Sequence, residues 1–271
     1  MFNSIRMTMA AAIAVAALTA GCGGTVAAQP PAPVESPTVV LVHGAFADSS
    51  SWNGVIKSLE AEGYPVMALA NPLRGLGSDA EYVRSVVDSV RGPVVLAGHS
   101  YGGSVMSQAA DGLPNVKALV YIASFILEAG ESTGQLAAKF PGAELGPALD
   151  TVPFSLSDGR SGDDLYIKRD EFRRVFAADV PEDVSALMAA TQRPIAAAAL
   201  EERATKAAWK TIPSWNMITT KDLAIPAESM RFMGERANSR TVEIDASHAV
   251  TVSQPRAVAD LIDRAAEATR G

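Results

Sequence analysis

The chain has 271 residues, a formal net charge of −7 at pH 7, 48% hydrophobic residues and a single cysteine. This length suits one large domain with a sizeable core. The acidic balance, with no cluster of Lys and Arg, argues against nucleic acid or an anionic lipid surface as a partner. A lone cysteine excludes an internal disulfide.

Residues 1–28 have the composition of an export signal. An apolar run over residues 8–20 follows one arginine and is too short to span a bilayer. The run ends in Leu-Thr-Ala-Gly-Cys at residues 18–22, which resembles the lipobox of bacterial lipoproteins and implies acylation of Cys22. The alternative is ordinary signal cleavage after Ala28, which would give a soluble periplasmic or secreted protein. Both readings predict export, the first to a bacterial membrane through a lipid anchor.

Residues 29–37 are a proline-rich tether, and residues 38–271 are predicted to form the folded domain. Apolar runs predict strands at residues 38–42, 65–69, 94–97, 116–123, 214–219 and 241–244. Amphipathic stretches predict helices at about residues 52–63, 79–91, 104–110, 226–237 and 255–268. This alternation predicts an α/β fold with a mostly parallel sheet of about six strands, flanked by helices.

The alternation is interrupted over about residues 127–208. A loop rich in Gly and Pro and a polar stretch at 155–164 accompany short helical patterns at 170–177, 181–191 and 194–203. The segment offers no strand candidate. We therefore expect a small helical cap inserted into the α/β domain.

The third predicted strand runs into Gly98-His99-Ser100-Tyr101-Gly102, and a helix follows. A serine on so tight a strand-to-helix turn is strained and projects its hydroxyl above the sheet, and glycine relieves the crowding on either side. A plain glycine-rich turn is the alternative, but it would not need a buried strand before it and a helix after it. The pattern predicts a nucleophile elbow with Ser100 as the nucleophile.

A serine hydroxyl needs a base within hydrogen-bond reach, and the chain has three histidines. His99 adjoins Ser100 and is predicted to face away from the site, because successive side chains on a strand point to opposite sides. His43 follows the first strand and is predicted to brace loops near the elbow. His248 follows the last strand, at the same carboxyl edge of the sheet as Ser100, and is the predicted base.

The acid that orients the base is expected between the serine and the histidine in the chain, after another strand. Asp222 satisfies this and comes one strand before His248. Its alternative role is a carboxylate stabilised by the dipole of the next helix. Glu128 is a second candidate, and Asp245 is too close to His248 in the chain to reach it.

A tetrahedral intermediate requires two backbone N–H donors. One is expected from Tyr101, the residue after the nucleophile, and the other from Ala45 in the loop after the first strand. Gly44 would let that loop pass close to Ser100.

Five segments together resemble the α/β-hydrolase superfamily over about residues 36–270: 42–44, 71–78, 98–103, 222–226 and 247–248. Asn71 departs from the superfamily, which usually has Asp there. The chain resembles the compact branch of plant methylesterases, hydroxynitrile lyases and small bacterial esterases. This resemblance implies hydrolysis of a carboxylic ester through an acyl-enzyme. A carbon–carbon or cyanohydrin lyase, an amide or lactone hydrolase and a non-catalytic receptor are the alternatives.

No cofactor or metal is expected. Residues 75–80 fit the spacing of a dinucleotide-binding loop but do not directly follow a strand. Asp163 and Asp164 are predicted to lie in a solvated loop without a histidine nearby. The expected partner is a small-molecule ester, and the apolar residues of the cap favour an apolar acyl or alcohol group. Contact with a membrane is expected only through the lipid anchor.

Overall fold

The computed structural model of the protein describes residues 36–155, 157, 159 and 161–270. The predicted leader with Cys22 and most of the predicted tether therefore lie outside the described residues. Within this part of the chain, no helix has both the length and the apolar character needed to cross a membrane.

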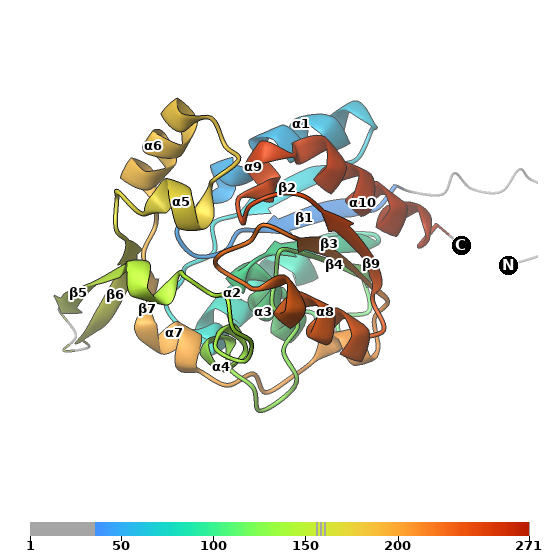
Figure 1. Ribbon diagram of the computed structural model, residues 1–271. Coiled ribbons are helices and arrows are strands. Elements are labelled where there is room, and N and C mark those ends of the chain that lie inside the picture. Colours follow the sequence, from blue (N-terminus) through green and yellow to red (C-terminus); the bar gives the residue numbers. More distant parts are fainter. Residues whose placement is uncertain (1–35, 156, 158, 160, 271) are drawn as a thin grey trace, which may run out of the picture. The chain divides into compact units, whose positions relative to one another are not determined.

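Six parallel strands form the central sheet, in the order β2-β1-β3-β4-β8-β9 (Figure 1). Their bounds are β1 Thr38–Val42, β2 Val66–Leu69, β3 Val94–His99, β4 Val116–Ile122, β8 Ser214–Thr219 and β9 Arg240–Ile244. Every residue of β3 is buried. The predicted α/β fold and its six strands are confirmed, and the strand ends differ from the predicted ones by at most two residues.

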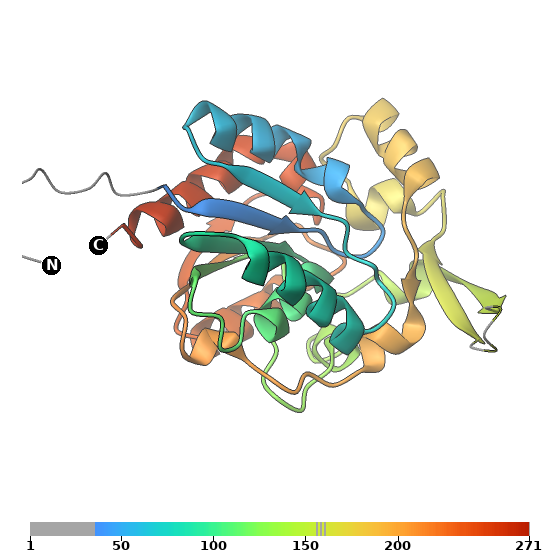
Figure 2. The ribbon, with the colours of Figure 1, turned by 180° about the vertical axis from the view of Figure 1, so that it is seen from behind.

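Helices cover both faces of this sheet. Figures 1 and 2 show α1, α9 and α10 over one face and α2, α3 and α8 over the other. Their bounds are α1 Asn53–Ala61, after a 3₁₀ turn at Ser49–Trp52, α2 Leu76–Ser89, α3 Tyr101–Ala109, α8 Ala227–Arg236, α9 Val250–Ser253 and α10 Pro255–Glu267. Because both of their faces are covered, the central strands β1, β3 and β4 consist mostly of Val, Leu, Ile and Ala rather than of alternating polar and apolar residues.

The inserted cap was predicted to be helical, and this is wrong in part. It contains a three-stranded antiparallel sheet of β5 Leu149–Ser155, β6 Ser161–Ile167 and β7 Ile195–Ala196. Its helices are α4 Thr133–Ala137, α5 Phe172–Phe176, α6 Glu182–Thr191 and α7 Ala197–Glu201, with 3₁₀ turns at Gly146–Ala148 and Ala208–Lys210.

The strands of the cap escaped prediction because their residues do not carry a strand pattern. The hairpin of β5 and β6 stands out from the body of the domain (Figure 1), and most of β5 is exposed. Neither face has to be apolar, so the alternation that marks a half-buried strand is missing. In the polar stretch 155–164, Ser155 ends β5 and residues 161–164 begin β6, and the helix predicted from residue 194 is preceded by β7.

Candidate active site

Ser100 sits on the turn between β3 and α3 with φ 55° and ψ −127°. Residues other than glycine rarely have a positive φ of this kind, so the backbone is strained at Ser100. A Cβ atom at Gly98 would lie 2.7 Å from the backbone of Gly102, and one at Gly102 would lie 2.3 Å from the carbonyl oxygen of Val42. The steric reason predicted for both glycines is confirmed.

The structure brings together the three side chains predicted as nucleophile, base and acid. The Nε2 atom of His248 lies 2.9 Å from Ser100 Oγ, and its Nδ1 atom lies 2.7 Å from Asp222 Oδ2. Asp222 follows β8 and His248 follows β9, so all three lie at the carboxyl edge of the sheet. The result is a continuous line of hydrogen bonds from a carboxylate to a serine hydroxyl.

Asp222 is held by hydrogen-bond donors on both of its oxygens. Oδ1 accepts the amides of Ala224 and Ile225, each at 2.8 Å, and Oδ2 accepts the hydroxyl of Thr219 at 2.8 Å. The side chain is fully buried. Because an ionised carboxylate only accepts, His248 must present a protonated Nδ1 to it, which leaves the Nε2 lone pair facing Ser100.

The two rival acids lie elsewhere. Glu128 pairs with Lys210 at 2.7 Å, and the hydrogen bond from that lysine lowers the pKa of Glu128. Asp245 is largely exposed and lies 3.9 Å from Lys221. Neither contacts His248 in the part of the chain that the structure describes.

Ala45 and Tyr101 border a small cavity of about 60 Å³ that also opens onto Ser100. Among the described residues, neither backbone amide donates a hydrogen bond. A Cβ atom at Gly44 would lie 2.7 Å from the Cβ of Ser100, so only glycine allows this close approach. The rest of the lining is Phe46, Phe125, Thr133, Gly134, Ala137, Leu145, Leu200, Ala224 and Ile225.

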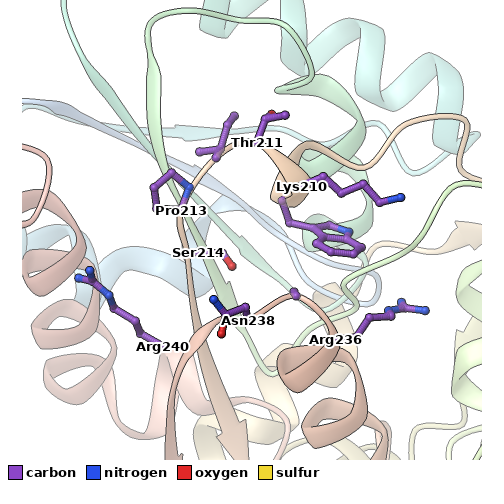
Figure 3. A pocket seen from close by; sticks show the side chains of 10 residues that line it. Lys210, Thr211, Pro213, Ser214, Arg236, Asn238 and Arg240 are labelled. Carbon is purple, nitrogen blue, oxygen red and sulfur yellow. The ribbon is translucent and has the colours of Figure 1, made fainter.

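A larger cleft of about 550 Å³ (Figure 3) shares no lining residue with this cavity. It is lined by Ser214 and Arg240, which begin β8 and β9, and therefore lies at the amino edge of the sheet. Two of the basic side chains that line it form ion pairs, Lys210 with Glu128 and Arg236 with Glu131. Although this cleft is larger than the cavity at Ser100, none of the predicted site residues lines it.

His43 braces the loops beside the elbow, as predicted. Its Nε2 accepts the amide of Asn71 at 3.0 Å, and its Nδ1 donates to the carbonyl of Gly44 at 2.8 Å. The Asn71 side chain donates in turn to the carbonyl of His43 at 3.0 Å. The asparagine that departs from the superfamily pattern thus completes this brace, and burial lowers the pKa of His43 to about 4.

His99 was predicted to face away from the site, and this is wrong. Its Nε2 donates to the carbonyl of His248 at 2.8 Å, and the two rings lie 4.7 Å apart. The prediction rested on the alternation of side chains along β3, which does not account for the loop carrying His248 that packs against His99. Burial and the neighbouring His248 lower the pKa of His99 to about 3, so it stays neutral.

Because His99 is neutral in the folded protein, we expect the free energy of unfolding to depend on pH. Below about pH 6.5 the unfolded chain protonates residue 99, whereas the folded chain does not until about pH 3. The unfolded state binds the extra proton, so stability falls as the pH falls. Between about pH 4.5 and 5.5, His99→Gln should reduce the slope of unfolding free energy against pH by about 1.4 kcal/mol per unit. Urea denaturation measures this, and equal slopes would contradict it.

Sequence reasoning missed Asp79, a fully buried carboxylate next to the elbow. It accepts the Tyr101 hydroxyl at 2.9 Å and the Arg74 amide at 3.1 Å, and burial raises its pKa. The guanidinium of Arg74 lies 2.8 Å from Asp164 on β6. Asp164 is therefore part of an ion pair rather than of a solvated loop, and the described residues contain no group of side chains that could hold a metal ion. In the sequence, the one feature that pointed to Asp79 was its position in the glycine-rich stretch 75–80.

The family model described as alpha/beta hydrolase family matches residues 39–261. The chain belongs to the alpha/beta hydrolase family. It is 27% identical over 252 residues to the alpha/beta hydrolase nvfD of Aspergillus novofumigatus, covering 85% of this chain and 96% of that protein.

A second relative of this hydrolase is the pyrethroid hydrolase of Sphingobium wenxiniae, 28% identical over 260 residues, with 84% of this chain and 89% of the relative covered. The crystal structure of polyneuridine aldehyde esterase superposes with a TM-score of 0.73 at 19% identity, covering 85% of this chain and 99% of that one. At such identity the likeness establishes the fold, and the side-chain geometry must carry the chemistry.

Proposed function

We propose that this hydrolase cleaves a carboxylic ester through an acyl-enzyme formed on Ser100. The contact that carries the proposal is the 2.9 Å approach of His248 Nε2 to Ser100 Oγ, with Asp222 behind the imidazole. Relatives named pyrethroid hydrolase and polyneuridine aldehyde esterase support this assignment. A serine at the elbow argues against the epoxide hydrolases and haloalkane dehalogenases of the superfamily, which use a carboxylate there.

In the proposed mechanism, Ser100 Oγ attacks the ester carbonyl while His248 Nε2 takes its proton. The Nδ1–H bond to Asp222 stabilises the imidazolium that forms. The amides of Ala45 and Tyr101 donate to the developing oxyanion. His248 then protonates the leaving alcohol, and a water molecule activated by the same histidine releases the acid from Ser100.

The lining of the cavity supports an uncharged, apolar substrate group. Apart from Ser100, the Tyr101 hydroxyl and the Thr133 hydroxyl, its described side chains are aliphatic or aromatic. A charged substituent would lose its hydration there without gaining a counter-ion. We therefore propose a neutral ester as the substrate.

Export and lipid anchoring at Cys22 are also proposed, and they are supported by the leader sequence alone. Cell fractionation combined with labelled palmitate distinguishes this anchor from cleavage after Ala28. Incorporation that Cys22→Ser abolishes would support the anchor, whereas an unlabelled soluble product would contradict it.

Rapid mixing with p-nitrophenyl butyrate tests the proposed reaction. We expect a burst of about one p-nitrophenol per active site when deacylation is slower than acylation. Acid quenching and peptide mass spectrometry should then find the butyryl group on the peptide that carries Ser100. Turnover without an acylated peptide at any time point would contradict the acyl-enzyme. A lyase would convert cyanohydrins or carbon–carbon substrates instead, without acylating the serine.

A further inference from the structure

A second cavity, of about 150 Å³, lies beside the one at Ser100. It is lined by the loop after β1 and the 3₁₀ turn that follows, by helix α6 of the cap and the residue after it, and by Val252 in α9. Phe46 lines both cavities. Phe46 is therefore the residue that the two cavities share.

The surrounding structure fixes Phe46 in a conformation that it would not adopt alone. Its φ is 61°, in the left-handed region that disfavours side chains, and the residue is only 3% exposed. Its amide donates to the carbonyl of Arg193 in the cap at 3.0 Å, and its ring packs edge-on against Phe176 at 6.3 Å. Strain of this kind persists where neighbours determine the conformation, and it gathers at ligand sites.

Neither Ser100 nor His248 lines the second cavity, and Phe46 and Phe176 connect it to the reacting groups. The ring of Phe176 contacts both Phe46 and His248, the latter at 4.9 Å. Val252 in the second cavity comes four residues after His248. The first cavity is instead lined by Ala45, Tyr101 and Ser100 itself. The second cavity is thus on the histidine side of the site.

The chemistry of ester cleavage assigns a substrate group to each side. His248 must return its proton to the oxygen of the leaving alcohol, so the alcohol has to lie on the histidine side. The acyl group stays attached to Ser100 and occupies the space beside the oxyanion donors. A cavity of about 60 Å³ has room for a short chain only.

We propose that Phe46 determines specificity by separating a small acyl subsite at Ser100 from a larger alcohol subsite beneath α6. This assignment rests on the proposed ester hydrolysis. The substrate class is an ester of a short apolar acid with a bulkier alcohol. Val184, Met188 and Val252 provide apolar contacts for that alcohol.

Two series of esters test the assignment with Phe46→Ala. One series varies the alcohol (ethyl, butyl and hexyl acetate), and the other varies the acid (p-nitrophenyl acetate, butyrate and octanoate). Removing the ring should raise the ratio of kcat/KM for hexyl acetate to that for ethyl acetate about tenfold, because it opens the first cavity toward the second. The octanoate-to-acetate ratio should rise by less than the hexyl-to-ethyl ratio, because most of the space that becomes accessible belongs to the second cavity.

Leu73→Ala is the matched control. Leu73 is also buried at φ 61°, and its carbonyl accepts a hydrogen bond from Ala196 of the cap at 3.0 Å, but it lines neither cavity. This variant should move neither ratio. Met188→Trp, which fills the second cavity, should lower the hexyl-to-ethyl ratio and provides the reverse test if Phe46→Ala does not fold.

The results separate failure of this assignment from failure of the proposed function. A shift in the acyl ratio alone would place Phe46 in the wall of the acyl subsite and overturn the assignment. Unmoved ratios in a protein that hydrolyses esters, or the same shift in Leu73→Ala, would also overturn it. If neither the wild type nor any variant hydrolyses an ester of either series, the proposed function itself fails.

Discussion

Ser100→Ala is expected to lower kcat for p-nitrophenyl butyrate by on the order of 10⁴-fold or more. The alanine keeps the strained elbow but removes the oxygen that His248 Nε2 contacts at 2.9 Å. The amides of Ala45 and Tyr101 and the apolar cavity remain, so a small rate above that in water should persist. Steady-state assays of the purified domain, with substrate well above KM, measure the loss.

Ser107→Ala is the control for this change, because Ser107 is another buried serine, on the helix that follows the elbow. It should keep activity within a few-fold of the wild type. Adding His248→Ala to Ser100→Ala should cost little more, because the two residues act as a unit. If Ser100→Ala retained more than about one hundredth of the activity, another group would be the nucleophile.

Much of the fold could be predicted because each central strand carries its own signal. The continuous apolar runs of β1 and β3 can only be buried on both faces, and the amphipathic helices between strands fix a parallel sheet. The placement of Ser100, Asp222 and His248 followed from the same rule, since the carboxyl ends of parallel strands share one edge. These three residues could therefore be predicted to lie together without knowing the conformations of the loops between the strands.

The cap could not be predicted to the same degree, because its strands bury little. The residues of β5 are mostly exposed, so no periodic pattern distinguishes them from a loop. β7 has only two residues, Ile195 and Ala196. It pairs with β6, about thirty residues earlier in the chain, and a local sequence pattern cannot indicate such a pairing.

His99 and Asp79 illustrate a second limit. The alternation of side chains along β3 does not say which loop packs against His99, and the loop that carries His248 does so. Asp79 looks like a residue of a polar helix start until the structure places the Tyr101 hydroxyl 2.9 Å away. Contacts between residues distant in the chain decide both cases, and such contacts leave no trace in local sequence.

Asp222→Asn should lower kcat/KM for p-nitrophenyl butyrate by about 10³- to 10⁴-fold. The carboxylate accepts from four donors: the amides of Ala224 and Ile225, the Thr219 hydroxyl and His248 Nδ1. An asparagine has one oxygen to offer. If its NH₂ group faces His248, the imidazole takes the other tautomer and Nε2 can no longer accept the proton of Ser100. The loss should therefore appear in kcat.

Asp245→Asn and Glu128→Gln are the matched controls, because they make the same change at the two rival acids. Both should keep activity within about twofold, since neither carboxylate contacts His248 and exposed ion pairs contribute little. A larger loss in either control than in Asp222→Asn would assign the acid to that residue instead. Urea denaturation of Asp222→Asn decides between the two orientations of the asparagine. An NH₂ group turned toward Ala224 and Ile225 breaks the loop and lowers the midpoint, whereas one turned toward His248 leaves those two hydrogen bonds intact and abolishes catalysis in a stable fold.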